Sequence, residues 1–270
     1  MKNKVIAMYF SATGTTKKVV SEIAKLISED IGEEVTDTIN FTLPGVRENS
    51  VTFNEADLVI IGVPVIAGRV PNVLLKYLNS ITGNGALAVP IVLYGNRNYD
   101  DALIELADIL EAHGFKIIAG AAFIGEHSFS KILAKDRPDD TDMAIVRNFA
   151  NQIYKKITQD NNKTVVVRGN KPYRGYYMPK TKDGIPVDMR KITPKTNSNC
   201  NKCLICVPLC PMGSIDSQDI SKFNGICIRC CSCVKNCPAG ARYFDDENFI
   251  RHKSELEINY ADRKEPEFFI

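Results

Sequence analysis

The sequence predicts an α/β protein with a five-stranded parallel sheet wound by helices on both faces, followed by a small α+β module. Two observations lead to this prediction. Over the first 160 residues, short runs rich in Val and Ile alternate with segments of helical periodicity, which is typical of a doubly wound parallel sheet. Further along, eight of the nine cysteines lie between residues 200 and 237. The 270 residues suffice for one ordinary domain and one small one.

The elements of the expected sheet follow from apolar runs and helical spacing. Strands are expected at residues 4–10, 34–41, 57–63, 88–94 and 115–124. Helices are expected at residues 15–28, 71–81, 99–113 and 139–157. One apolar face marks the third helix, at Leu103, Leu106, Ala107 and Leu110. Ligands bind such sheets beyond the carboxyl ends of the strands, so the loops after Phe10, Val63, Tyr94 and Ile124 are the candidate binding loops.

The loop after the first strand has the composition of a phosphate site. It reads Ser11, Ala12, Thr13, Gly14, Thr15, Thr16 and then opens a helix. Hydroxyl groups, a glycine and a helix N-terminus together form a cradle for one terminal phosphate. A Ser/Thr-rich helix cap is the alternative. The loop lacks the lysine of a Walker A motif, and the glycine string at residues 83–88 precedes a strand, so no dinucleotide fingerprint is present.

The other candidate loops offer groups for a flat ligand. The segment after the fourth strand supplies Tyr94, Gly95, Asn96, Asn98 and Tyr99. Tyr99 has a ring for stacking, although a half-buried tyrosine at a helix start is the alternative. The third strand is followed by Pro64, Val65, Ile66, Ala67, Gly68 and Arg69, and we expect Arg69 to be a solvated surface residue. His127, after the fifth strand, is a weak candidate for a protonation role.

The cysteines form two copies of one pattern, C-x2-C-x2-C-x3-C-P, offset by 27 residues. This spacing is that of two [4Fe–4S] clusters, in which the fourth cysteine of each copy ligates the other cluster. The expected first set is Cys200, Cys203, Cys206 and Cys237. The expected second set is Cys227, Cys230, Cys233 and Cys210. Zinc sites favour pairs of ligands separated by a longer loop. Cys231 falls outside the pattern, and we interpret it as a packing residue, with a redox-active thiol as the alternative.

These motifs resemble two known families. Residues 199–244 resemble the bacterial two-cluster ferredoxins. Residues 1–158 look like a flavodoxin, through the S-x-T-G-x-T loop and the G-x3-Y segment. That likeness implies FMN, with phosphate contacts from the loop at 11–16 and stacking by Tyr99. Many flavodoxins place an aromatic ring where this chain has Ile66. The combination resembles the flavodoxin–ferredoxin fusion proteins of anaerobic bacteria and archaea.

The expected division is a flavodoxin-like domain at 1–160, a basic linker at 161–198, a ferredoxin-like domain at 199–245 and an acidic C-terminal tail at 246–270. We expect the linker to pack as a positive strap beside the cofactors, with RNA contact as the alternative. A net charge of +2 predicts no nucleic-acid partner. No apolar stretch approaches the length of a membrane helix. Free thiols predict a reducing cytoplasm.

Two functions from different classes follow from the residues and the resemblance. The first is an electron-transfer protein that passes low-potential electrons between FMN, two clusters and redox proteins such as ferredoxin- or flavodoxin-dependent oxidoreductases. The second is an FMN-dependent reductase of a small substrate, fed by the clusters. A convergent polar pocket around Asn98 and His127 favours the second. Oligomeric state and the direction of electron flow are not indicated by the sequence.

Overall fold

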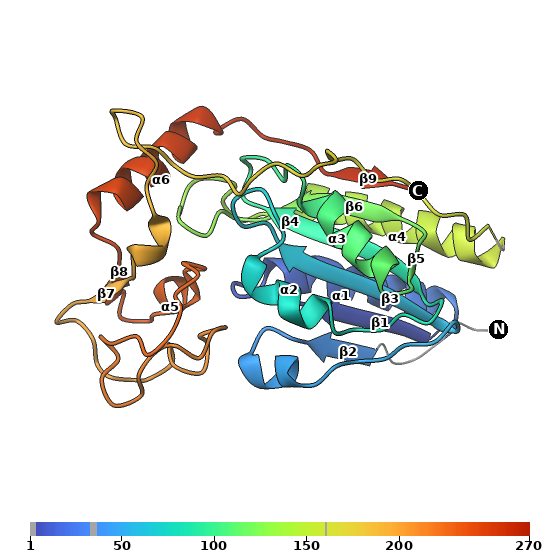
Figure 1. Cartoon of the computed structure of the whole chain (residues 1–270), viewed down its shortest axis with the longest axis horizontal. Helices are drawn as coiled ribbons and strands as arrows, with labels where there is room; N and C mark the ends of the chain where they lie inside the picture. Colours follow the sequence, from blue (N-terminus) through green and yellow to red (C-terminus); the bar gives the residue numbers. More distant parts are fainter. Residues whose placement is uncertain (1–3, 33–36, 160) are drawn as a thin grey trace.

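The computed structural model describes residues 4–32, 37–159 and 161–270. Its centre is a parallel sheet in the order β2-β1-β3-β4-β6, with β5 in line with β6 along β4 (Figure 1). The parallel strands are β1 (Lys4–Tyr9), β2 (Asp37–Asn40), β3 (Asp57–Pro64), β4 (Leu87–Tyr94), β5 (Lys116–Ile117) and β6 (Gly120–Ile124). This order is that of the flavodoxin-like doubly wound sheet. The predicted fold class is confirmed.

Helices cover both faces of the sheet, because each has one apolar stripe. Helices α1 (Thr15–Asp30) and α4 (Asp140–Thr158) bury one face, where Val20, Ile23 and Phe149 are fully buried. Helices α2 (Asn72–Leu78) and α3 (Ala102–Ala112) bury the other. The apolar face predicted for the third helix lies in this second core. The predicted fifth strand is split at residues 118–119, and the predicted residues 34–36 of the second strand lie outside the described part.

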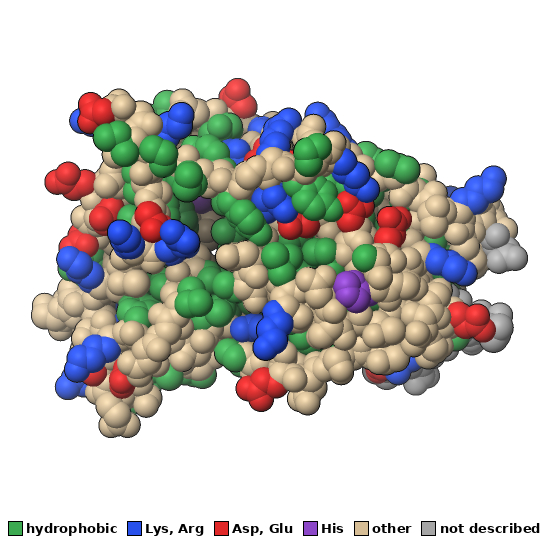
Figure 2. All heavy atoms as spheres, viewed as in Figure 1, with side chains coloured by type: hydrophobic (Ala, Val, Ile, Leu, Met, Phe, Trp, Pro, Cys, Tyr) green, Lys and Arg blue, Asp and Glu red, His purple; other side chains and the backbone are tan. Residues whose placement is uncertain are grey.

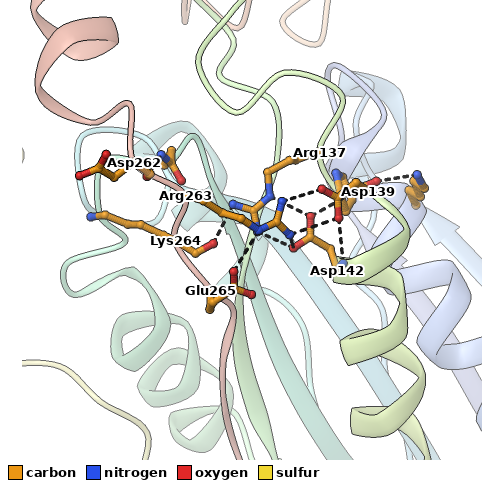
Figure 3. A network of polar contacts seen from close by, with 10 residues as sticks. Arg137, Asp139, Asp142, Asp262, Arg263, Lys264 and Glu265 are labelled. Atoms are coloured by element: carbon orange, nitrogen blue, oxygen red, sulfur yellow. Dashed lines mark hydrogen bonds and ion pairs between the residues drawn. The ribbon is translucent and has the colours of Figure 1, made fainter.

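The C-terminal tail is an integral part of the sheet, which corrects the expectation of an acidic appendage. It contains α6 (Glu247–Asn259) and β9 (Glu267–Phe269), and β9 pairs antiparallel with β6. Between them, Arg263 forms ion pairs with Asp139 (2.6 Å) and Asp142 (3.3 Å), and Arg137 donates to Lys264 O (2.7 Å), as Figure 3 shows. Asp139 is therefore the N-cap of α4 and also an anchor for the tail.

The segment at 161–198 packs along the α/β domain and is not a free linker. Val165 N–H donates to Ile117 O (2.9 Å), and Asp101 accepts N–H groups of Asn170 (2.9 Å) and Arg174 (2.7 Å). Tyr177 N–H then donates to Ala67 O (2.8 Å). We call residues 161–190 the strap. Its course follows the loops after β3 and β4 toward the carboxyl ends of the parallel strands.

The cysteine-rich residues form a lobe beside that end of the sheet (Figure 1). Regular structure in it is short: β7 (Lys195–Thr196) pairs antiparallel with β8 (Arg242–Tyr243), and α5 spans Ser232–Lys235. Two 3-10 turns flank the region, η1 (Pro44–Glu48) on the α/β domain and η2 (Met189–Lys191) at the end of the strap. Among the described residues, no helix is both long and apolar enough to cross a membrane.

Candidate functional site

A cavity of about 600 Å³ lies between the carboxyl ends of the strands and the cysteine-rich lobe. The α/β domain contributes the loops after β1, β3, β4 and β6. The opposite wall comes from the strap, α6 and residues 228–230. Figure 2 shows a hollow in the surface on the side of the lobe, edged by hydrophobic and basic side chains. The volume lies in the range typical of small-molecule and cofactor sites.

One end of the cavity is suited to an anion. Thr13, Thr15 and Thr16 line it. Gly14 is the N-cap of α1 with φ 92°, a left-handed conformation that favours glycine. The first N–H groups of a helix have no intrahelical partner, and of these the N–H of Lys17 donates to Ser11 Oγ (3.0 Å). The N–H groups and hydroxyls that remain form an anion-binding end.

Most, but not all, of the predicted ligand-contacting residues line the cavity. Those that do are Thr13, Thr15, Thr16, Pro64, Val65, Ile66, Ala67, Gly68, Tyr94, Gly95 and Asn98. Tyr99 instead is buried, with its ring 5.6 Å from that of Tyr94 and its hydroxyl donating to Glu267 (2.8 Å). Asn96 is also buried and donates to Tyr260 O (2.6 Å) and Asp262 O (2.8 Å). Both residues therefore hold the C-terminal tail, and the stacking role predicted for Tyr99 does not fit its position.

Arg69 is a buried anchor for the strap, which corrects the expectation of a solvated residue. Its guanidinium forms a bidentate ion pair with Glu105 (2.8 and 2.7 Å) and donates to Arg174 O (2.6 Å). The rings of Tyr173 and Tyr176 lie over it, at 4.7 and 5.1 Å. The Glu105 contact and the neighbouring acidic groups raise the pKa of Arg69 despite its burial. This cluster fixes the strap where its next residues, 176–179, become a wall of the cavity.

Two histidines reach the cavity from elements far apart in the sequence. Nδ1 of His127 accepts the N–H of Phe129 (3.1 Å), so the proton of the neutral ring is on Nε2. A Cβ on Gly95 would lie 2.4 Å from this ring, so only glycine admits it. Burial, followed by the charges of His252, Lys235 and Arg97, lowers the pKa of His127 to about 4. His252 on α6 is buried, stacks on Tyr177 (5.8 Å), and has its pKa lowered by burial.

The second predicted set of cysteines surrounds a separate, smaller cavity of about 20 Å³. Its lining includes Cys210, Cys227, Cys230 and Cys233, together with apolar side chains such as Met212, Ile215 and Phe223. Burial raises the pKa of Cys230 to about 12 and that of Cys233 to about 11. For the first predicted set, burial raises the pKa of Cys206, and Cys200 and Cys203 lie near enough to add to it.

The backbone repeats with the cysteines. Lys202 and Arg229 have φ 57° and 54°, and Leu204 and Cys231 both have 59°. In each copy the fourth cysteine accepts an N–H from four residues on, Ser214 to Cys210 (3.4 Å) and Ala241 to Cys237 (3.3 Å). The bridges Thr196–Arg242 and Ile215–Phe223 also correspond at the offset of 27 residues. The segment before each motif therefore pairs with the segment after the other.

All nine cysteines are free thiols. Cys231 is buried beside Ile192 and Phe249, which agrees with a packing role. Among the described residues, no three His, Cys, Asp or Glu side chains are close enough to hold one metal ion. In a cubane each cysteine ligates a different iron, so its ligands do not converge on one ion.

The two cavities share a wall. Ile228, Arg229 and Cys230 line both the large cavity and the cysteine cavity. Lys235 fixes this wall to the α/β domain by an ion pair with Glu126 and a hydrogen bond to His127 O (3.0 Å). Arg47 donates to Pro211 O (2.7 Å) and so holds the first motif.

Sequence reasoning missed the strap and α6 as walls of the cavity. Tyr177, Met178, Met189, His252 and Leu256 line it from segments that were interpreted as a linker and a tail. The aromatic residues of the strap were the available signal, because tyrosines amid basic residues form cation–π contacts, as Arg97 does with Tyr177 (4.6 Å). His252 carried no signal, since a lone histidine in a charged helix has no distinguishing pattern.

The sequence matches no family model, and no curated protein matches it. Several solved structures are similar. A flavodoxin from the domain Archaea is 17% identical, with 58% of this chain and 99% of that chain covered and a TM-score of 0.41. A Fusobacterium nucleatum flavodoxin bound to flavin mononucleotide is 16% identical, with 59% and 99% covered and a TM-score of 0.38. Rubredoxin oxygen:oxidoreductase from Desulfovibrio gigas is 16% identical, with 59% and 38% covered and a TM-score of 0.39. The flavodoxin-like fold of this chain rests on its own strand order.

Proposed function

We propose that the chain is an electron-transfer protein that holds FMN in the large cavity and two [4Fe–4S] clusters in the cysteine-rich lobe. In this proposal residues 1–160 bind the flavin, residues 199–245 bind the clusters, and residues 161–198 and 246–270 join the two parts. The observation that carries it is the wall formed by residues 228–230, which borders both cavities. A cluster on Cys230 would therefore adjoin the flavin.

The residues present fit these cofactors. The anion-binding end with Thr13, Thr15 and Thr16 suits the terminal phosphate of FMN. The loops after β3 and β4 bring backbone groups and Asn98 to the position of a flat ring. When bound, FMN exchanges two electrons one at a time, whereas each cubane passes single electrons. The role of the chain is to hold these groups close together and to exclude water from them.

The cysteine sets support crossed ligation. Cys210 lines the same cavity as Cys227, Cys230 and Cys233, and buried thiols with raised pKa values become thiolates only beside a metal or another cation. The repeated backbone and the reciprocal bridges support a second, related site. The partners that fit this chemistry are ferredoxin- or flavodoxin-dependent oxidoreductases of a reducing cytoplasm.

Anaerobic purification, iron and sulfide analysis and identification of the released flavin test the proposal. We expect about eight iron atoms and one FMN per chain. Thr13→Val should weaken FMN binding by about 1–3 kcal/mol, whereas Thr38→Val, on the exposed edge strand β2, should leave it unchanged. Zinc in place of iron, or FAD in place of FMN, would contradict the proposal. Reduction of flavin by the clusters should be independent of protein concentration, because the transfer is within one chain.

One observation favours a second candidate function, the reduction of a small substrate at the flavin. Asn98, His127 and His252 meet in a cavity that the strap covers, and this polar, sheltered space suits a substrate better than a protein partner. Turnover with quinones, nitroaromatics and nicotinamide nucleotides, compared with turnover with redox proteins, separates the two. Saturable reduction of one small molecule, well above any protein-dependent rate, would favour the reductase.

A further inference from the structure

Arg242 is a buried cation inside the cysteine-rich lobe. It lies on β8, with only 3% of its surface exposed. Its Nη1 donates to Thr196 Oγ1 (3.0 Å) and Ile220 O (2.5 Å), and the ring of Phe223 lies 5.3 Å away. Its Nε and Nη2 are buried with no hydrogen-bond partner. Among the described residues, no carboxylate forms an ion pair with it. An unpaired guanidinium removed from water is costly, so its environment calls for an anion.

The groups around Arg242 belong to both predicted cysteine sets. Its charge lowers the pKa of Cys206, of the first set, and of Cys227 and Cys233, of the second, in each case against a larger effect of burial. Cys206 and Cys233 pack together with Ile215 in one small apolar cluster. Ile215 is the residue that corresponds to Arg242 at the offset of 27. One side of the space between the two sets is thus apolar and the other cationic.

We propose that Arg242 is a fixed positive charge shared by the two clusters, and that it raises the reduction potential of both. This inference rests on the proposed function. Each reduction adds one electron to a cubane from a low-potential one-electron donor, and no bond or proton is exchanged. The added negative charge is stabilised by a guanidinium that is already desolvated and oriented, and its free N–H groups are donors for cluster sulfur.

The test compares Arg242→Gln, which keeps polar contacts but removes the charge, with Arg242→Lys, which keeps the charge. Ile215→Val is the matched control, because it alters packing between the same two sets without a change of charge. We expect redox titration followed by EPR to give more negative potentials for Arg242→Gln. The shift should correspond to about a tenfold change in the equilibrium constant for reduction, or about 59 mV. Arg242→Lys should lie closer to the wild type, and Ile215→Val should not shift.

A measurement on the unsubstituted protein covers the case in which Arg242→Gln fails to assemble its clusters. With arginine labelled by ¹⁵N, pulsed EPR of the reduced protein should show a nitrogen coupled to the cluster spins. Arg242→Lys, grown with the same label, should lose that coupling. Unchanged potentials in Arg242→Gln, or no coupled nitrogen in the unsubstituted protein, would overturn the inference. Absence of iron in all of these proteins would instead overturn the proposed function.

Discussion

The two cysteine motifs have the same backbone and different surroundings. Both carry left-handed residues at corresponding positions, Lys202 with Arg229 and Leu204 with Cys231. In the first motif Cys203 and Leu204 are exposed to solvent. In the second, Cys231 is buried and Arg229 lines both cavities. The spacing of the cysteines determines the local conformation, whereas contact with the α/β domain makes one motif the outer and the other the inner.

The contacts that create this difference are few. Lys235 of the inner motif pairs with Glu126, and its counterpart at the offset of 27 is Pro208, which has no charge to offer. Ile228 joins the apolar core of the α/β domain, while its counterpart, Asn201, is exposed. The inner motif is thus adapted to face a second cofactor, and the outer one to face solvent or a partner protein.

The largest expected effect is that of metal removal. Anaerobic chelation of iron should unfold residues 199–245 and leave the α/β domain at 4–159 folded. The reason is that the lobe has only two small apolar clusters, so that metal binding supplies much of its folding free energy. Hydrogen exchange measured by mass spectrometry checks this. Protection of 199–245 that survives complete loss of iron would show that the motifs fold without clusters.

Exchange of the fourth cysteines tests whether the motifs are truly crossed. Cys210→Ser should remove the inner cluster and Cys237→Ser the outer one, so each should lower the iron content by about half. Hydrogen exchange should then rise at 227–233 in Cys210→Ser and at 200–206 in Cys237→Ser. Cys231→Ala is the control and should keep both clusters. A rise at 200–206 in Cys210→Ser would mean that each motif holds its own cluster.

The sequence predicted the parts whose signals are local. Five apolar runs and their helices were sufficient for the sheet, since the period of apolar residues reports burial directly. Cysteine spacing was sufficient for the two ligand sets. The strap and the tail were missed, because their packing depends on single distant contacts, such as Arg69 with Glu105 and Tyr99 with Glu267. Strand β9 has three residues, too few to show a period.

Oxidation should distinguish outer from inner by rate. Under limited ferricyanide, the cluster on Cys200, Cys203 and Cys206 should be lost several-fold faster, because Cys203 is exposed whereas Cys230 lies between two cavities. Iron content and EPR, followed over time, should show two phases of about equal amplitude. In Cys237→Ser, which lacks the outer cluster, the fast phase should be missing. A single phase in the unsubstituted protein would mean that the two sites are equally accessible.

The contact between the inner motif and the α/β domain should depend on pH through His127. Burial lowers the pKa of His127 to about 4, so the unfolded chain binds a proton more readily. Stability is therefore lost as the pH falls from about 6.5 toward 4. The loss should be on the order of 2 kcal/mol, after allowance for water in the cavity. His127→Gln should reduce this pH dependence and His113→Gln, at the end of α3, should not. Cluster loss in acid affects all three proteins alike, so the differences in melting temperature report the histidine.

The smallest expected effect is that of the ion pair that fixes the inner motif. Lys235→Met should lower the free energy of unfolding by about 1 kcal/mol, because a partly buried pair with Glu126 and a hydrogen bond to His127 O are lost. Lys202→Met, on the exposed outer motif, removes the same charge and should change stability by less than about 0.5 kcal/mol. Chemical denaturation of the iron-loaded protein checks both. Because Lys235 joins the wall shared by the two cavities to the α/β domain, Lys235→Met should also slow flavin reduction by the clusters more than Lys202→Met does. Equal effects of the two substitutions on stability and on rate would mean that the inner motif is held in place by its apolar contacts alone.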